Sequence, residues 1–268
     1  MRLSHFAPLP PTTATLLVQA SHPDSRTTLT VIASDKMVYG TVRIMCEFLG
    51  FESSLPHMIQ TAGVAPLSQL AIACDLWISG SRLQSKIVDS ARMSLGALVI
   101  GCLTPLAVEQ DLNEGTAATQ IRAASFGLFS SLAYSLVARQ DPEQFDSVAS
   151  VAQMRQIPIA DAYQSVVGES IRDAAGRVAH AWGLTRELSI ALQGPRDFYL
   201  DPTERLMVDA CEVATMAAQA AGVSVEPWPY IAKQDSIEQI ALIQAMAMRA
   251  KRVAGRLEEE LENLRSSA

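Results

Sequence analysis

The side chains that most often bind metals or transfer protons are few and scattered in this sequence. Its 268 residues include four histidines, His5, His22, His57 and His180. Imidazole ligands act in convergent sets, commonly as pairs three or four positions apart on one helix face. No two of these histidines have that spacing, so we interpret each as a surface or partly packed residue.

The cysteines also lack the spacing of a metal site. Cys46, Cys74, Cys102 and Cys211 stand singly among apolar residues. None forms a C-x-x-C pair or lies near a histidine at zinc-finger spacing. Isolated cysteines in apolar surroundings are typical of buried free thiols in a reducing compartment. We therefore expect unpaired thiols and a cytoplasmic location, with no metal and no other cofactor.

Two adjacent serines, Ser130 and Ser131, lie in the middle of a predicted apolar helix. A nucleophilic serine needs a neighbouring base, which the sequence does not offer here. Serines in Ala-rich helices usually bond back to the carbonyl group one turn earlier. Asp161, Glu169 and Asp173 form a cluster of carboxylates, but a solvated helix face explains them better. The glycines form neither a G-x-G-x-x-G motif nor a P-loop.

Helix signals account for nearly the whole chain. Asp35 and the pair Asp201-Pro202 are predicted helix N-caps, and Gly168 and Gly222 are predicted helix ends. No stretch alternates apolar and polar residues as a strand does, so the expected fold class is all-α, a multi-helix bundle. The predicted central helices are the two most apolar ones, Gln84–Leu103 and Gly115–Ala138.

Composition and charge exclude several classes of partner. The sequence has 28 acidic against 21 basic residues, a net charge of −7, and no basic tract. Phosphate neutralisation needs clustered Lys and Arg, so we expect no nucleic-acid partner. No apolar run follows Met1–Pro10, so we expect no signal peptide. The apolar stretch Leu95–Val108 is interrupted at Pro105 and falls short of a membrane span, so we expect no membrane partner.

One stretch has a recognisable order of residues. From Gly168 to Leu184 it reads G-x7-G-x5-W-G-L, and the N-terminal part contains the segment Leu9-Pro10-Pro11. This order resembles the signature of the HDOD domain, an all-helical bacterial regulatory module related to metal-dependent HD phosphohydrolases. The resemblance covers residues 8 to about 225 and implies an HD-like helical bundle.

The sequence departs from the HDOD pattern at several landmarks. Asp35-Lys36 stands in place of an Asp-Pro pair, and Cys46-Glu47 replaces an Asn-Ser pair. The resemblance also implies where the metal ligands of HD enzymes would fall. Those positions hold Asp89, Ser130, Ser131, Ile171 and Gln193. Two serines, an isoleucine and a glutamine cannot hold a divalent ion, so the resemblance implies a scaffold without catalysis.

Two functions remain open at this point. The first is a signalling or regulatory protein that acts by binding another protein. The second is a sensor in which the former active-site cleft holds a nucleotide such as a cyclic dinucleotide. Arg92 and Arg122, on the two central helices, are the basic residues expected near that cleft to contact a phosphate. A working phosphohydrolase is rejected because the ligand positions are lost.

The last predicted helix, Asp235 to about Arg265, has a heptad seam. We expect residues 1–228 to form the HDOD-like domain and residues 229–268 a C-terminal helical extension. The first half of the seam can pack back on its own domain. For the second half we expect a homodimer contact or a partner helix. The residues assigned to that contact are Ala254, Leu257, Leu261 and Leu264.

Overall fold

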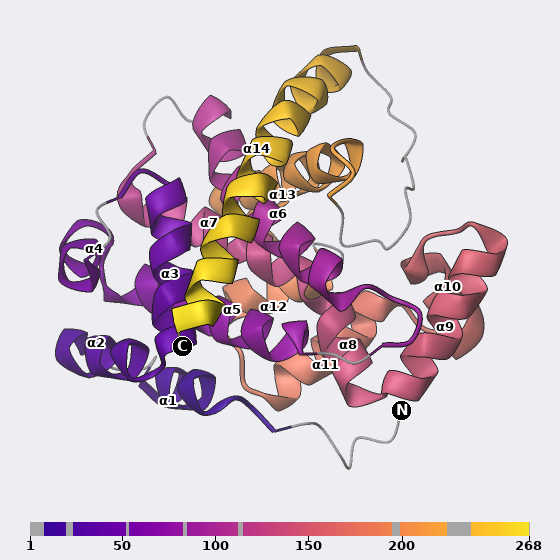
Figure 1. Cartoon of the computed structure of the whole chain (residues 1–268), viewed down its shortest axis with the longest axis horizontal. Coiled ribbons are helices and arrows are strands. Elements are labelled where there is room, and N and C mark those ends of the chain that lie inside the picture. The colour runs from indigo at the N-terminus through magenta and orange to yellow at the C-terminus, as the bar shows by residue number, and fades with distance from the viewer. Residues whose placement is uncertain are drawn as a thin grey trace.

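Every regular element in the described part of the chain is a helix (Figure 1). The computed structural model describes residues 8–19, 24–51, 54–82, 85–111, 115–194, 199–223 and 237–267. Its helices are α1 (Pro11–Gln19), α2 (Ser25–Ser34), α3 (Lys36–Phe48), α4 (Leu55–Ala62), α5 (Val64–Ser81), α6 (Ser90–Asp111), α7 (Ala117–Ser131), α8 (Ala133–Gln140), α9 (Pro142–Arg155), α10 (Ile159–Val167), α11 (Ile171–Ala181), α12 (Arg186–Gln193), α13 (Pro202–Ala220) and α14 (Ile237–Ser267). The predicted all-α fold class is confirmed.

The caps expected from the sequence begin and end helices at the predicted places. The Asp35 carboxylate accepts hydrogen bonds from two backbone N–H groups at the start of α3. Asp201 and Glu204 form a reciprocal capping box at the start of α13. Gly168 ends α10 in the left-handed conformation, with φ of 84°. Each cap satisfies backbone groups that the first or last helical turn would otherwise leave unpaired.

The core is built around α5, α6 and α7, which pack against one another. Helices α6 and α7 approach closely because Gly127 has no side chain. A Cβ atom there would lie 3.0 Å from the carbonyl oxygen of Ile100 and 2.2 Å from Oγ1 of Thr104. The buried side chains at this crossing include Leu128 and Phe129. Burying a side chain of this size stabilises the fold by about 1.5–3 kcal/mol.

The two central helices differ from the predicted ones. α6 begins at Ser90, later than expected, and continues through Pro105 to Asp111. The second predicted helix is two helices in the structure, α7 and α8, which meet at Leu132 with a bend of 42°. A proline does not end α6 because the helix is held by packing against α7, α13 and α14.

The length of α6 also bears on the expectation that this stretch falls short of a membrane span. Ser90–Val108 is long and apolar enough to cross a membrane, and the bent pair α7 and α8 passes the same test together. The expectation that this stretch is too short was therefore wrong. The α6 stretch is 78% buried inside the structure, which is the position of a core helix.

Outer helices surround this core on several sides (Figure 1). α13 and α14 pack on α6, while α3 packs on α5 and α12 packs on α7. α9 and α10 pair at one edge, and α1, α2 and α4 lie at the opposite edge. α11 packs between α8 and α12, and this arrangement brings the ends of several helices around one cleft.

Helix α14 packs along α3, α6 and α13 of its own chain. Leu257 and Leu261 are 0% and 5% exposed, and Ala254 is also buried. Leu264 is partly buried and lies over Gly40, where a Cβ atom would come within 2.3 Å of its Cδ1. The four residues assigned to a homodimer or partner contact therefore lie on the side of α14 that packs within its own chain. The expected domain boundary at residue 228 lies outside the described residues.

Candidate functional site

Three of the five positions that the HDOD resemblance assigned to metal ligands lie around one cleft of about 470 Å³. Ser130 comes from the end of α7, Ile171 from the start of α11 and Gln193 from the end of α12. Helices α10 and α13 complete the wall with Asp161 and Cys211. We call this hollow the Ser130 cleft.

Ser130 is held by internal contacts. Its hydroxyl group donates to the carbonyl oxygen of Gly127 at 2.9 Å, and its Oγ lies 2.8 Å from Sγ of Cys211. Burial raises the pKa of the Cys211 thiol, opposed by the contact with Ser130 and by Arg172. A thiol with a raised pKa stays protonated and is a poor nucleophile at neutral pH. The pair is therefore suited to packing rather than to covalent chemistry.

Gln193 closes the opposite side of the cleft against α11. A Cβ atom on Gly176 would lie 2.5 Å from Cγ of Gln193, so the Gln193 side chain lies across the bare backbone of α11. Arg172 holds the same corner, because its Nη1 donates to the carbonyl oxygen of Leu192 at 3.4 Å. The missing side chain of Gly176 therefore leaves room for Gln193.

The other two predicted positions do not line the Ser130 cleft. Ser131 is 4% exposed, and its hydroxyl donates to the carbonyl oxygen of Gly127 at 3.1 Å. Asp89 caps α6, where its Oδ1 accepts from the N–H groups of Ala91 and Arg92. The structure thus assigns Asp89 a helix cap at a different cavity.

The two arginines proposed for a phosphate lie elsewhere as well. Arg122 binds the Glu187 carboxylate with both Nε and Nη2, at 3.2 and 3.1 Å. Gln69 donates to the same carboxylate at 3.2 Å, so this network joins α5, α7 and α12. Arg172, rather than Arg92 or Arg122, is the arginine among the described residues of the Ser130 cleft. Sequence reasoning missed it because only the packing of α11 on α12 decides which way it faces.

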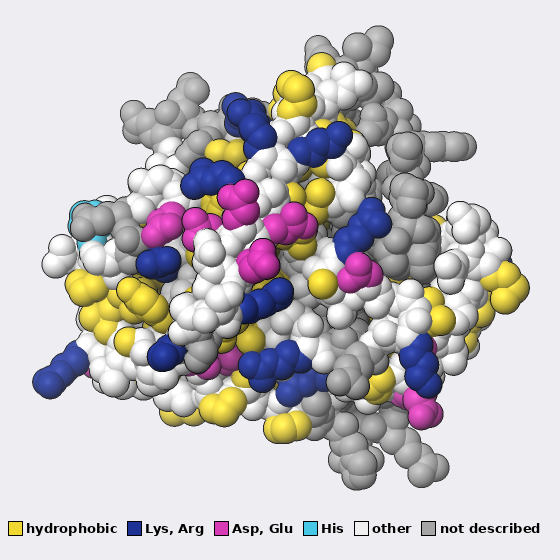
Figure 2. Space-filling view, in the orientation of Figure 1, with side chains coloured by type: hydrophobic (Ala, Val, Ile, Leu, Met, Phe, Trp, Pro, Cys, Tyr) yellow, Lys and Arg dark blue, Asp and Glu magenta, His cyan; other side chains and the backbone are white. Residues whose placement is uncertain are grey.

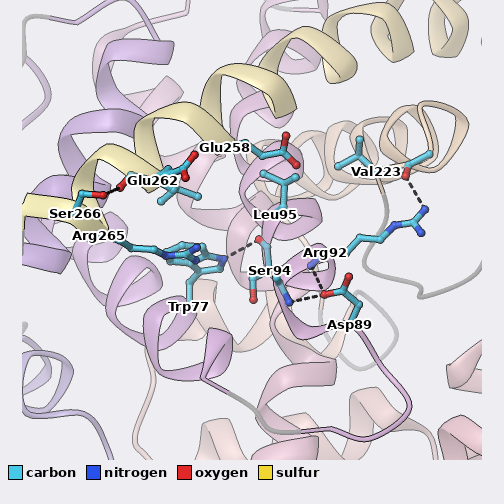
Figure 3. Close-up of a pocket in the computed structure, with 13 residues that line it drawn as sticks. Trp77, Asp89, Arg92, Ser94, Leu95, Val223, Glu258, Glu262, Arg265 and Ser266 are labelled. Atoms are coloured by element: carbon cyan, nitrogen blue, oxygen red, sulfur yellow. Dashed lines mark hydrogen bonds between the residues drawn. The ribbon is translucent and has the colours of Figure 1, made fainter.

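Arg92 lies at a second cavity, of about 760 Å³, which we call the Trp77 cavity (Figure 3). Its Nη2 donates to the carbonyl oxygen of Gly222 at 2.8 Å and so caps the end of α13. Nε1 of Trp77 donates to the carbonyl oxygen of Ser94 at 2.8 Å. The wall opposite comes from α14, which contributes Glu258, Leu261, Glu262, Arg265 and Ser266. No local pattern in the sequence marks this cavity, because α5 and α6 on one side and α14 on the other are far apart in the chain.

Carboxylates line the Ser130 cleft without forming a metal-binding group of three among the described residues. Its described lining residues include the carboxylates Asp161, Asp173 and Glu212 but no histidine. Among the described residues, no three His, Cys, Asp or Glu side chains are close enough to share an ion. Glu169, the remaining member of the predicted carboxylate cluster, forms an ion pair with Arg177.

Comparison with solved structures identifies the fold. An HDOD domain protein of unknown function from Geobacter sulfurreducens superposes with a TM-score of 0.63 at 11% identity, covering 98% of this chain and 92% of that one. A proposed phosphohydrolase from Shewanella amazonensis gives 0.59 at 14% identity, covering 92% of each chain. A proposed signal transduction protein from Marinobacter aquaeolei gives 0.59 at 14% identity, covering 97% of this chain and 58% of that one.

No family model matches the sequence, and no curated protein matches it either. At 11–14% identity, the likeness to the solved structures is one of fold. The chain has the HDOD or HD-like fold, and the fold expected from the Gly168–Leu184 motif is confirmed.

Proposed function

We propose that this chain with an HDOD-like fold is a non-catalytic signalling protein that acts by binding another protein. The observation that carries the proposal is the set of residues that line the Ser130 cleft. Where an HD enzyme would hold metal ligands, Ser130 bonds to Gly127 and contacts Cys211, while Gln193 covers Gly176. A site whose proposed ligand positions hold a serine, an isoleucine and a glutamine has little capacity to bind a metal ion that would activate a water molecule.

Two further observations support a signalling role in the cytoplasm. One solved structure with the same fold is an HDOD domain protein and another is a proposed signal transduction protein, which is the class of function we transfer to this chain. All four cysteines are free and buried, as is usual in a reducing compartment.

A nucleotide sensor is the alternative for the same cleft. Arg172 provides a cation at its wall, but Asp161, Asp173 and Glu212 line it too. Carboxylates beside a bound phosphate repel it, so the described lining disfavours an anionic ligand. The cleft therefore supports the non-catalytic protein-binding role better than the sensor role.

The test combines hydrolysis assays with thermal unfolding. We expect no hydrolysis of phosphomonoester or phosphodiester probes with Mn²⁺, Mg²⁺ or Ni²⁺, and no rise in melting temperature with these ions or with cyclic dinucleotides. Metal-dependent hydrolysis abolished by Glu212→Gln would refute the proposal. A nucleotide-induced rise that Arg172→Ala removes and Arg92→Ala retains would replace it with the sensor.

A further inference from the structure

The outward face of α14 carries its charges in two blocks. Arg249, Lys251 and Arg252 form a basic block, and Glu258, Glu259 and Glu262 form an acidic block one to two turns later; all six side chains are exposed. Figure 2 shows Lys and Arg side chains over the upper part of this helix and Asp and Glu side chains below them. The face is thus positive in one half and mainly negative in the other, where Arg265 is an exposed basic residue.

This arrangement of charges does not stabilise α14 itself. Within the described part of the chain, none of the six charged side chains forms an ion pair, in contrast to Arg122 or Arg177. Arg249 and Arg252 are three positions apart, and Glu258 and Glu262 are four apart, so like charges are neighbours on the helix surface. Such pairs destabilise a helix, whereas alternating signs would stabilise it.

An exposed glycine separates the two blocks. A Cβ atom on Gly255 would meet nothing within 4 Å, so no packing within the chain requires a glycine there. Glycine in the interior of a helix is unfavourable relative to alanine. The stripe that contains it, in steps of three and four, also includes Met248, which is 66% exposed. A bare backbone beside an exposed apolar side chain allows another helix to approach closely.

We propose that two copies of the chain pair through this face, with their α14 helices antiparallel and crossing at Gly255. A two-fold axis at Gly255 places Arg252 of one copy beside Glu259 of the other, and Lys251 beside Glu258, because these residues lie at similar levels and on the same flank of the contact. Symmetry repeats both pairs, so each basic block meets an acidic block. A parallel pair would instead set like charges together, and the charges therefore select the antiparallel arrangement.

The contact uses the exposed side of α14, away from the buried Leu257, and its edge at Glu258 and Glu262 also lines the Trp77 cavity. It is independent of the function proposed above, because none of its residues lines the Ser130 cleft. Its exposed charges are screened by salt, so association should weaken as ionic strength rises.

The experiment is sedimentation of the full chain between about 0.05 and 0.5 M NaCl. We expect a dimer at low salt that dissociates at high salt. One variant carries Arg249→Glu, Lys251→Glu and Arg252→Glu, and the other carries Glu258→Lys, Glu259→Lys and Glu262→Lys. Each should be monomeric alone, because its face has a single sign, and an equimolar mixture should form a heterodimer.

Two controls separate this contact from a general charge effect. Arg26→Glu, an exposed change on α2, should leave the dimer intact. Gly255→Phe should abolish it without changing the circular dichroism spectrum, because nothing in the chain lies within 4 Å of the added Cβ. A wild-type chain that is monomeric at low salt, a dimer that survives in both charge variants, or a mixture that stays monomeric would each overturn the proposal.

Discussion

Asp75 is the carboxylate that joins the first helix to the core. It is 6% exposed, and its Oδ2 accepts hydrogen bonds from both the N–H group and the hydroxyl of Thr13, each at 2.7 Å. Burial raises the pKa of Asp75 above its ordinary value of 3.8, opposed by these hydrogen bonds and by Arg139 and reinforced by Asp35. Burial in turn lowers the pKa of Arg139.

The raised pKa of Asp75 predicts a pH dependence of stability. Because the folded state binds the proton more tightly than the unfolded state, the free energy of unfolding should rise as pH falls from neutral through the folded pKa, and level off below about 3.8. Asp75→Asn keeps an oxygen acceptor for Thr13 and should flatten this rise. Asp75→Ala leaves the Thr13 groups unpaired and should cost about 1–3 kcal/mol.

Urea unfolding of the three proteins between about pH 4 and pH 7 measures both effects. An equally steep rise in Asp75→Asn would assign the pH dependence to another group.

Single residues were predictable where their partners are local. Asp35 and Asp201 were identified as caps because the N–H groups they bind are two or three positions away. The partner of Asp75 is 62 residues distant, and the partner of Arg122 is 65 distant. No local pattern points to such contacts. The same holds for Arg92 and Arg172, whose surroundings are set by helices packed much later in the chain.

At the scale of the elements, the crossing of α6 and α7 rests on Gly127. A Cβ atom there would press on the backbone carbonyl of Ile100, which cannot rotate away as a side chain can. Gly127→Ala should therefore destabilise the protein by about 1–3 kcal/mol. Gly255→Ala is the matched control, because its Cβ meets nothing, and it should stabilise the helix by up to about 1 kcal/mol.

Both variants would be measured by chemical unfolding in high salt. Equal changes in the two variants would show that helix propensity, and not the close approach of α6 and α7, governs Gly127.

The presence of helices was predicted from the sequence more accurately than the residues at which they begin and end. Pro105 was interpreted as an interruption and Leu132 as an interior position, and both interpretations failed. A proline costs a helix one hydrogen bond, which buried packing on several sides can outweigh. No glycine or proline next to Leu132 indicates the 42° bend there. Tertiary contacts decide such cases, and they lie outside any short window of sequence.

At the scale of the whole molecule, the C-terminal helix is part of the same core as the N-terminal helices. Leu257→Ala should therefore lower the global free energy of unfolding by about 2–5 kcal/mol. The neighbouring surface change Glu259→Ala should stay within about 0.5 kcal/mol in high salt. Hydrogen exchange is the sharper measurement, because amides of α3 and α14 should lose protection together in Leu257→Ala.

Loss of protection confined to α14 would contradict this prediction and indicate that α14 unfolds separately from the rest of the core. The HD-like fold itself was predictable from the order of helices and the Gly168–Leu184 motif. The pairing of α14 with α3 was not, because a heptad seam does not reveal whether its partner belongs to the same chain.

The contact of Leu264 with Gly40 has a consequence for the nascent chain during synthesis. Helix α3 leaves the ribosome roughly 200 residues before α14, an interval of about 10–40 s at a synthesis rate of about 5–20 residues per second. Throughout that time the apolar residues of α3 that pack against α14 are exposed to solvent. Translation speed and chaperone access during this interval, as much as the stability of the finished fold, should therefore limit how much of this protein a cell can accumulate.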